Sequence, residues 1–426
     1  MSRGWLAPPL GCASLRAAFG RLPVRSSQGG LRVPEAPVYL DHHATTPVDP
    51  RVVEAMAPWW TERFGNAASA THRYGWEAEA AVEAARERIA RAIGAADPGE
   101  IVFTSGTTES DNLAIAGLAR ARSGRGGRIV TTAIEHPAVL DTARALEAEG
   151  FEVHVIPVAA DGLVDPAQVE AGLGEQPLLV SVGAANSEIG VLQPLEAIGE
   201  RCRRRGVPFH SDAAQAVGKI SIDVDRLGVD LLSFCAHKLY GPKGIGALYV
   251  RRTRGAAGSG ARLRLVPILH GGGHERGRRS GTVPVPLVVG FARAVELCLE
   301  EQAGEAKRQA QLRDHLWDRL HTGLAGVHRN GHPERRLPGN LSVAFEGVEA
   351  DALIASLREF ALSAGSACAS GSGEPSHVLR AIGLPAALAR GALRVGLGRS
   401  TTLAQIDRLA DRLIEEVEGL RARRRG

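Results

Sequence analysis

The stretch Ser233-Phe-Cys-Ala-His-Lys-Leu-Tyr-Gly-Pro-Lys-Gly-Ile-Gly246 joins an apolar run to a glycine-rich turn. Residues 231–235 predict a buried strand, so Lys238 lies just beyond the end of that strand. Open parallel sheets bind their ligands at the carboxyl ends of the strands, where this lysine would project. A partly desolvated amine near other cations deprotonates more easily and can form an imine. Taken alone, however, a lysine at such a place is more often an ordinary surface residue.

Strand and helix patterns alternate from about Tyr39 onward, which predicts an α/β fold with a mainly parallel sheet. Short apolar runs predict core strands at 101–104, 128–132, 152–158, 178–182, 207–212, 231–235 and 246–250. A single helix is expected at 52–60, and a long polar helix at 288–323. A second unit is expected to contain strands at 341–345 and 392–396 and helices at 350–359 and 403–423. The expected domains are a large one of residues 51–289 and a small α+β one formed by 37–50 and 290–426.

The composition is that of an ordinary globular protein, with 44% hydrophobic and 23% charged residues among 426. No apolar run approaches the roughly 18 residues of a transmembrane helix, so we expect no membrane contact. The net charge of +4 is small for this length and gives no reason to expect direct nucleic-acid binding. Five widely spaced cysteines without a C-x-x-C pair argue against a disulfide scaffold and against a metal site: Cys12, Cys202, Cys235, Cys298 and Cys368.

The N-terminal residues 1–36 precede the first strand pattern and form a region of their own. The first 34 residues contain no Asp or Glu and five arginines, a composition that resembles an organelle transit peptide. Arginine is abundant throughout the chain, so a disordered extension explains the same composition. The expected compartment is the cytoplasm, with an organelle as the alternative if residues 1–34 are a transit peptide.

Three further segments place polar groups where they could meet Lys238. Asp212 ends a predicted strand, where a carboxylate can hold a ring nitrogen protonated, although an ordinary N-cap explains it equally well. Ser105-Gly-Thr-Thr108 opens a helix after a strand, and such a turn binds phosphate through its N–H groups and hydroxyls. His136 could stack on a flat ring and transfer protons, but a lone histidine is also a common structural residue. Together these groups supply what pyridoxal phosphate (PLP) requires of a protein.

Cys368 differs from the other cysteines in its surroundings, Ser363-Ala-Gly-Ser-Ala-Cys-Ala-Ser-Gly-Ser-Gly-Glu-Pro375. Small and polar neighbours give the thiol no apolar company to bury it, which favours an exposed, reactive nucleophile. A small residue in a plain linker is the alternative interpretation.

These segments, in this order, resemble the cysteine desulfurases of the NifS/IscS type. That group belongs to the class V aminotransferase family of fold-type I PLP enzymes. The resemblance extends from Val38 to about Arg421 and includes Tyr-Leu-Asp-His-His-Ala-Thr-Thr-Pro-Val-Asp-Pro (39–50), Thr-Ser-Gly-Thr-Thr-Glu-Ser-Asp-Asn (104–112) and Glu-His-Pro-Ala-Val-Leu-Asp (135–141). It continues with Asp-Ala-Ala-Gln-Ala-Val-Gly-Lys (212–219), Ala-His-Lys-Leu-Tyr-Gly-Pro-Lys-Gly (236–244), Ser-Ala-Gly-Ser-Ala-Cys (363–368) and Leu-Arg-Val-Gly-Leu-Gly-Arg (393–399).

The resemblance implies a role for each matching residue. Lys238 would be the Schiff-base lysine and the base for the substrate α-proton, Cys368 would attack the substrate sulfur, and His136 would stack on the cofactor ring. The remaining cofactor contacts would be Thr107, Thr108, Asn186, Ser187, Asp212 at the pyridine nitrogen, Gln215 at the phenolic oxygen, Cys235, His237, and Thr282 from a second subunit. The substrate contacts would be Asn66, Asn186 and Arg394. Arg394 would bind the substrate carboxylate, with help from the two asparagines.

The implied activity is a sulfurtransferase reaction that converts L-cysteine to L-alanine and leaves a persulfide on Cys368. The implied partners are a second copy of the chain and sulfur acceptors in iron–sulfur cluster assembly or tRNA thiolation. The resemblance is also compatible with contact between Cys368 and an iron–sulfur cluster during its transfer. Two positions depart from the family pattern, since Ser187 replaces a usual Asn and Cys235 replaces a phosphate-binding Ser. A thiol is a weak donor, so we expect a looser phosphate site. A selenocysteine lyase is the nearest alternative, and a non-catalytic sulfur-transfer partner is the alternative from another class.

Overall fold

A seven-stranded sheet forms the centre of the computed structural model, which describes residues 36–122, 126–252, 263–364 and 376–425. The strand order is β2-β8-β7-β6-β5-β3-β4. The strands are β2 (Ile101–Thr104), β3 (Arg128–Thr132), β4 (Glu152–Ile156), β5 (Pro177–Ser181), β6 (Phe209–Asp212), β7 (Leu231–Cys235) and β8 (Gly246–Val250). Strands β3 to β7 run parallel, whereas β8 is antiparallel to both β2 and β7. The predicted mainly parallel sheet is therefore confirmed.

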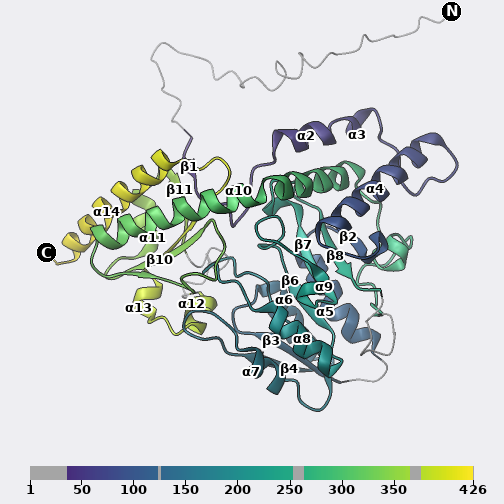
Figure 1. The fold of residues 1–426 in the computed structure, drawn as a ribbon, viewed down its shortest axis with the longest axis horizontal. Coiled ribbons are helices and arrows are strands. Elements are labelled where there is room, and N and C mark those ends of the chain that lie inside the picture. Colours follow the sequence, from purple (N-terminus) through teal and green to yellow (C-terminus); the bar gives the residue numbers. More distant parts are fainter. Residues whose placement is uncertain (1–35, 123–125, 253–262, 365–375, 426) are drawn as a thin grey trace, which may run out of the picture. The chain divides into compact units, whose positions relative to one another are not determined.

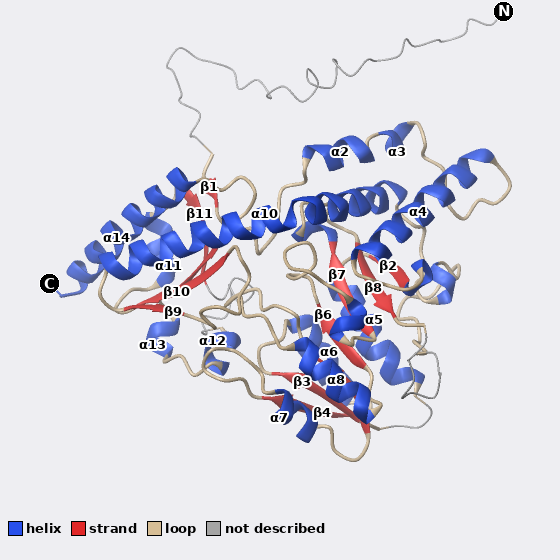
Figure 2. Ribbon diagram, viewed as in Figure 1, coloured by secondary structure: helices blue, strands red, loops and turns tan. Residues whose placement is uncertain are grey.

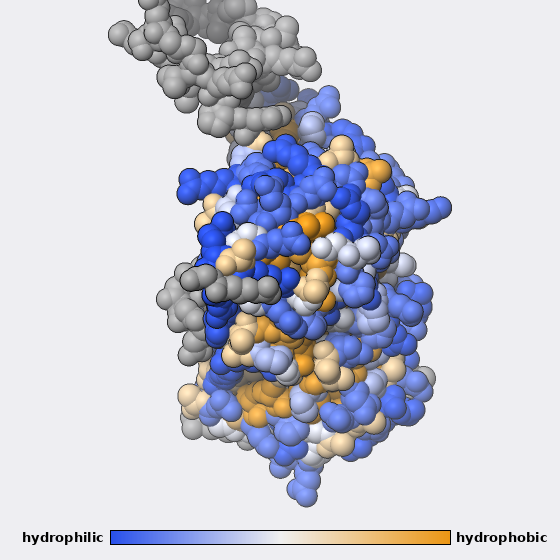
Figure 3. Space-filling model, turned by 90° about the vertical axis from the view of Figure 1, so that its left-hand side faces the viewer, coloured by the Kyte–Doolittle hydropathy of each residue, from blue (hydrophilic) through white to orange (hydrophobic). Residues whose placement is uncertain are grey.

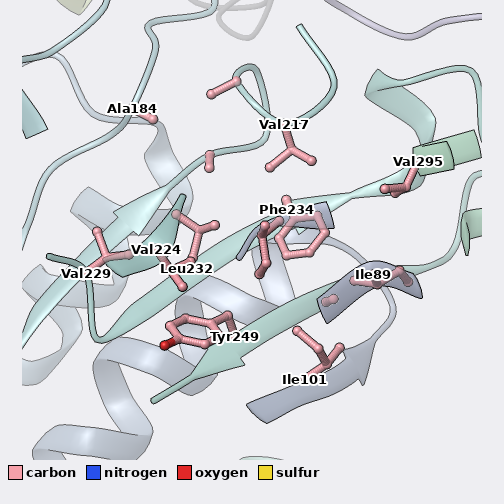
Figure 4. Packing of buried hydrophobic residues seen from close by; sticks show 14 of the residues in the cluster. Ile89, Ile101, Ala184, Val217, Val224, Val229, Leu232, Phe234, Tyr249 and Val295 are labelled. Atoms are coloured by element: carbon pink, nitrogen blue, oxygen red, sulfur yellow. The ribbon is translucent and has the colours of Figure 1, made fainter. Parts of the chain in front are cut away.

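Helices cover both faces of this sheet, as parallel strands require (Figure 2). Alternate residues point to opposite faces, so Ile101 and Phe103 join one apolar core while Val102 joins the other. The first core includes α4 (Arg73–Ala92) and α8 (Leu195–Arg205), and the second includes α5 (Thr107–Ala121) and α6 (Pro137–Glu147). Figure 4 shows Phe234 and Tyr249 of the sheet among the buried side chains of the first core, which also include Ile89 of α4. Every residue of β2, β7 and β8 is buried, which explains why these strands read as unbroken apolar runs, whereas the edge strand β4 is mostly exposed.

A smaller antiparallel sheet of four strands has the order β12-β13-β10-β9 within the described residues. Its strands are β9 (Val327–Arg329), β10 (Asn340–Phe345), β12 (Ser363–Ala364) and β13 (Ala392–Gly396), and nearby β1 (Val38–Tyr39) pairs in parallel with β11 (Phe360–Ala361). Helix α14 (Leu403–Arg425) and the second half of α10 (Val285–Gly323) share an apolar core with this sheet. The N-terminal strand thus returns to pair with a segment more than 300 residues away, as its register with Phe360 shows.

Helix α10 connects the two sheets (Figure 1). Its first half contributes Phe291 and Val295 to the core of the large sheet, and its second half contributes Leu316 and Leu320 to the core of the small sheet. Residues Val38–Gly426 cluster as one compact unit. The finer division into a large and a small domain therefore stays a prediction.

Two expected helices are wrong in extent. The expected single helix at 52–60 is two helices, α2 (Pro50–Met56) and α3 (Pro58–Thr61), because Pro58 has no N–H to continue the hydrogen-bond pattern. The expected helix at 350–359 ends at Ser356, since Phe360 pairs with β1 instead. The remaining short helices are α7 (Pro166–Ala171), α9 (Val224–Leu227), α11 (Ala350–Ser356), α12 (His377–Ala381), α13 (Ala386–Ala389) and the 3-10 turns η1 (Pro98–Glu100), η2 (Ala236–Lys238) and η3 (Glu275–Gly277).

The face drawn in Figure 3 is mainly hydrophilic, with apolar patches between the charged side chains. In the part of the chain that the structure describes, none of the helices combines the length and the apolar character needed to cross a bilayer. Three of the five cysteines, Cys202, Cys235 and Cys298, lie within the described residues, and all three are buried free thiols. No cluster of three His, Cys, Asp or Glu side chains placed to hold a metal ion occurs among the described residues.

Candidate active site

A cavity of about 740 Å³ lies beyond the carboxyl ends of the central strands, and its volume is typical of a small-molecule site. It gathers residues from widely separated segments, including His43 near the N-terminus and Arg394 of β13. Eleven of the residues singled out in the sequence line it: Thr107, Thr108, His136, Asn186, Ser187, Asp212, Gln215, Cys235, His237, Lys238 and Arg394. The fold therefore brings most of the predicted site residues together.

Lys238 ends the short turn η2, which follows β7 directly. Its Nζ donates hydrogen bonds to the carbonyl oxygens of His43 at 2.7 Å and Ala44 at 2.6 Å. The chain segment after β1 thus holds the amine at the wall of the cavity. In this position the Lys238 amine can react with a ligand in the cavity.

Asp212 ends β6, the strand beside β7, and lines the same cavity. Its Oδ1 accepts a hydrogen bond from the Ala214 N–H at 2.8 Å, which caps a turn, and no α-helix begins there. Burial raises the pKa of this carboxyl, while the charges of His136 and Lys238 oppose that shift. A positively charged group in the cavity would therefore favour the carboxylate strongly.

The N-terminus of α5 faces the cavity with Thr107 and Thr108 in its first turn. Its N-cap residue, Gly106, offers no side-chain cap, and the buried Thr107 hydroxyl has no hydrogen-bond partner in the structure. A Cβ at Gly246 would approach the Gly106 backbone to 2.7 Å, so glycine is needed for this close packing. Unsatisfied donors at the start of a 15-residue helix are suited to an anion such as a phosphate.

His237 belongs to the same turn as Lys238, and its ring approaches the N-terminal segment. Its Nδ1 is 3.2 Å from Thr45 Oγ1. Burial lowers the pKa of His237 to about 4, with Lys238 and Lys243 adding to the shift, so the ring is neutral near pH 7. A neutral imidazole carries one N–H, which can serve as a hydrogen-bond donor.

Cys235 is buried at the end of β7, close to Thr107. Burial raises the pKa of its thiol, and contact with Thr107 offsets this shift only in part, so the sulfur is protonated near pH 7. A buried, neutral thiol is a poor nucleophile and a weak donor. Cys235 therefore lines the cavity without the character of a reactive cysteine.

Cys235→Ser is expected to tighten the binding of a phosphate-bearing ligand by about 5-fold, because a hydroxyl gives one ordinary hydrogen bond in place of a weak one. The dissociation constant of PLP for the apoprotein measures this change. Cys202→Ser, at a buried thiol in α8 away from the cavity, is the matched control and should leave the constant unchanged. Equal or weaker binding by Cys235→Ser would show that the thiol does not limit the phosphate site.

His136 is the N-cap of α6, and its Nδ1 accepts a hydrogen bond from the Ala138 N–H at 3.1 Å. That bond leaves the proton of the neutral ring on Nε2. The imidazole is open to the cavity, and desolvation by its surroundings lowers its pKa, with Asp212 opposing the shift. The structure thus fixes one tautomer of His136 and presents its free N–H to a ligand.

Arg394 of β13 approaches the cavity from the small sheet. Its guanidinium donates to Asp41 Oδ1 at 2.8 Å and to the Ser187 carbonyl at 3.2 Å, while its buried Nε has no partner in the structure. Asn186 donates to the Ile134 carbonyl at 2.9 Å, and its Oδ1 accepts from two backbone N–H groups. Arg394 therefore retains a donor for a carboxylate, whereas the Asn186 amide is mainly engaged in holding its own turn.

Two of the described residues singled out in the sequence do not line this cavity. Asn66 and Thr282 are exposed. Thr282 was expected to act on the site of a second subunit, so its exposure agrees with that expectation without testing it. Cys368 lies outside the described residues.

Sequence reasoning missed several polar residues of the cavity, notably His43, Glu188 and His377. Burial raises the pKa of Glu188 to about 7, and its Oε2 accepts from Ser376 Oγ at 2.6 Å. His43 belongs to the matching segment 39–50 and Glu188 follows Ser187 directly, but nothing in their spacing indicated a shared cavity. For His43 the only signal was membership in a matching motif.

Comparisons with known proteins agree with this site. Residues 38–409 match the family described as aminotransferase class-V. The mitosomal cysteine desulfurase of Encephalitozoon cuniculi is 51% identical over 92% of this chain and 88% of its own length. The cysteine desulfurase IscS of an Anaeromyxobacter species is 51% identical over 90% of this chain and 93% of its own length.

Solved structures show the same relationship. A NifS-like protein superposes with a TM-score of 0.81 at 38% identity, covering 90% of this chain and 99% of its own. A structure titled SspA in complex with cysteine superposes with a TM-score of 0.74 at 41% identity, covering 84% and 98%. With a cavity that assembles the matching residues on the same fold, the chain belongs to the class-V aminotransferase family, among the cysteine desulfurases of the NifS/IscS type.

Proposed function

We propose that this chain is a PLP-dependent cysteine desulfurase that converts L-cysteine to L-alanine and leaves the sulfur as a persulfide on Cys368. The observation that carries the proposal is the meeting of Lys238, Asp212 and the open N-terminus of α5 in one cavity. The amine, the carboxyl group and the anion site are the groups that PLP needs for its aldehyde, ring nitrogen and phosphate.

The residues present fit this cofactor. The unpartnered Thr107 hydroxyl, the first turn of α5 and neutral His237 supply donors for a phosphate. Asp212, whose pKa is raised by burial, gains a favourable partner when a pyridinium lies beside it. When bound, PLP supplies an electron sink for the electron pair left at the substrate Cα after its proton is removed.

The protein residues divide the remaining work. Lys238 accepts the α-proton, and the two carbonyl oxygens that hold its Nζ set the position of that amine. The Nε2–H of His136 is fixed by its capping bond and can donate to a substrate atom. Arg394 orients the substrate through its carboxylate, which places the substrate Cα within reach of Lys238.

Arg394→Gln is expected to raise KM for L-cysteine by about 10- to 100-fold, the loss typical of hydrogen bonds to a charged group, with a smaller change in kcat. Steady-state kinetics of alanine formation measures both parameters. Arg390→Gln removes an exposed guanidinium four residues earlier, whose pair with Glu349 is a surface contact, and should leave KM unchanged. An unaltered KM in Arg394→Gln would exclude Arg394 as the carboxylate ligand.

Sulfur transfer follows from the same arrangement. The Cys368 thiolate attacks the substrate sulfur, so an S–S bond forms at Cys368 while the substrate C–S bond breaks and alanine leaves after protonation. The persulfide is the form in which sulfur passes to an acceptor. The name IscS among the relatives favours acceptors in iron–sulfur cluster assembly, and tRNA thiolation enzymes are the second class of acceptor.

The purified protein should release alanine and sulfide from L-cysteine in the presence of a thiol reductant. Comparison with L-selenocysteine separates this proposal from the selenocysteine lyase alternative. A preference for L-selenocysteine with little turnover of L-cysteine would favour the lyase. Absence of PLP binding would favour the non-catalytic alternative.

A homodimer is part of the proposal. Exposed aromatic side chains concentrate in one segment, Trp60, Phe64, Tyr74 and Trp76, and exposed Asn66 and Thr282 were both expected to serve a site. Aromatic residues are enriched at protein interfaces, so this surface supports contact with a second copy. Sedimentation of the purified protein at several concentrations tests the dimer.

The proposed compartment is the cytoplasm, with an organelle as the alternative. Relatives named mitosomal and mitochondrial exist in Encephalitozoon cuniculi and Drosophila melanogaster. The expectation for residues 1–36 falls almost wholly outside the described residues. The N-terminal sequence of the mature protein decides between the two compartments.

A further inference from the structure

A second, smaller cavity of about 40 Å³ lies behind Lys238. His43 and Lys238 line both this cavity and the larger one, so they form part of the wall between the two. Lys219 lines only the smaller cavity. The volume is suited to a few water molecules and too small for an amino-acid substrate. A second lysine therefore stands behind the one that would bind the cofactor.

Lys219 contacts the catalytic cavity through Gln215. Its Nζ donates to Gln215 Oε1 at 2.6 Å, and His43 Nδ1 lies 3.1 Å from the same oxygen. Gln215 Nε2 donates to the His43 carbonyl at 2.8 Å, and that carbonyl also accepts from Lys238 Nζ at 2.7 Å. The amide nitrogen of Gln215 and the amine of Lys238 therefore share one acceptor.

This network fixes which end of the Gln215 amide faces Lys238. When protonated, Lys219 has only donors and requires the amide oxygen on its own side. Burial lowers the pKa of His43 well below its usual value, so its ring is neutral and has one N–H. Its Nδ1 faces the Gln215 oxygen at 3.1 Å and its Nε2 faces the Gly339 carbonyl at 3.3 Å, and the one N–H serves one of these two acceptors. The Gln215 amide is therefore oriented by Lys219 at its oxygen and by the His43 carbonyl at its nitrogen. The Gln215 NH2 group is then held on the side of Lys238, where it can act as a donor to a bound ligand.

Lys219 also places a charge near Lys238. Burial, and then the charge of Lys238, lower the pKa of Lys219 to about 7. The other charged or titratable groups around Lys219 are His42, His43, Cys235, His237, Tyr240, Cys298, Glu301, Glu305, Arg394 and Arg399. Because electrostatic interactions are mutual, a protonated Lys219 disfavours positive charge on the Lys238 nitrogen.

We propose that Lys219 is a positioning residue for the PLP-dependent reaction: it orients the Gln215 amide toward the cofactor and places a positive charge behind Lys238. The inference rests on the proposed function for its reaction but concerns Lys219, to which no cofactor contact was assigned. It gives a function to a lysine whose partly buried charge would otherwise only lower the stability of the fold.

The first test is a double-mutant cycle on PLP affinity. Lys219→Met is expected to weaken PLP binding by about 5-fold in the wild-type background, since one donor orientation is lost. In the Gln215→Leu background the same change should have no effect, because no amide remains to orient. Equal losses in both backgrounds would overturn the inference. Lys307→Met, at an exposed lysine of α10, is the matched control and should bind PLP as the wild type does.

The second test separates charge from hydrogen bonding. Lys219→Gln keeps a donor and removes only the charge, so PLP affinity should stay within about 2-fold of the wild type. The pH midpoint of the visible absorbance change of Lys238-bound PLP should rise by about one unit in Lys219→Met and in Lys219→Gln, as expected when a nearby like charge is removed. An unchanged midpoint in both variants would contradict the electrostatic role. If the wild type bound no PLP, the proposed function itself would fail, which is a distinguishable result.

Discussion

Lys238→Ala is expected to lower the turnover of L-cysteine by more than about 10⁴-fold, the upper range for loss of a positioned proton acceptor. The variant also loses the covalent link to PLP, so borohydride reduction should attach no cofactor to the protein. Lys238 is held by the carbonyl oxygens of His43 and Ala44. Among the described residues, the other lysine that lines the large cavity is Lys243, which is exposed. Rate and cofactor content are measured on the same preparation.

The control for this prediction is Lys307→Ala, which removes an exposed lysine of α10. It should keep the wild-type rate and the wild-type cofactor content. Thermal unfolding of all three proteins shows whether the fold is intact. If Lys238→Ala retained reducible PLP on another lysine, or turned over L-cysteine at an appreciable rate, the assignment of Lys238 would be wrong.

Cys368→Ala is expected to separate the two halves of the reaction. Cofactor binding and spectral change on adding L-cysteine should persist, because they depend on the cavity residues and not on this thiol. Persulfide formation should be lost, and alanine formation should fall by roughly 10³-fold or more, as for the loss of other catalytic nucleophiles. Peptide mass analysis and alanine assays measure the two effects.

Cys202→Ala provides the contrast for this variant, because Cys202 is a buried thiol of α8 and does not line the cavity. It should retain both persulfide formation and alanine release. Wild-type rates of alanine and sulfide release from Cys368→Ala would refute the persulfide mechanism.

Much of the fold could be predicted because the central strands are buried on both faces. Their sequences are therefore short apolar runs, and β2, β3, β7 and β8 have the expected boundaries. The expected helix at 350–359 extends too far, because Phe360 belongs to a strand whose partner, Val38, lies far away in the sequence. Such pairings depend on tertiary contacts that local periodicity does not record.

The site could be predicted where the residue type at the end of a strand suggests its chemical role, as a lysine suggests an imine and an aspartate suggests a partner for a ring nitrogen. Lys238 and Asp212 follow neighbouring strands, so their meeting could be expected from the sheet alone. Two features could not be predicted from the sequence, because they depend on side-chain directions. They are the hydrogen bonds by which Asn186 holds its own turn and the position of Lys219 behind Lys238. Lys219 was quoted only as the last residue of a motif, and its contact with Gln215 appears in the folded chain alone.

The most direct measurement is a single turnover with sulfur-labelled L-cysteine, followed by analysis of both products. The account predicts one labelled sulfur on the peptide that contains Cys368 for each alanine formed, and neither product in Lys238→Ala. Alanine formed without label on Cys368, or label on Cys368 without alanine, would contradict it.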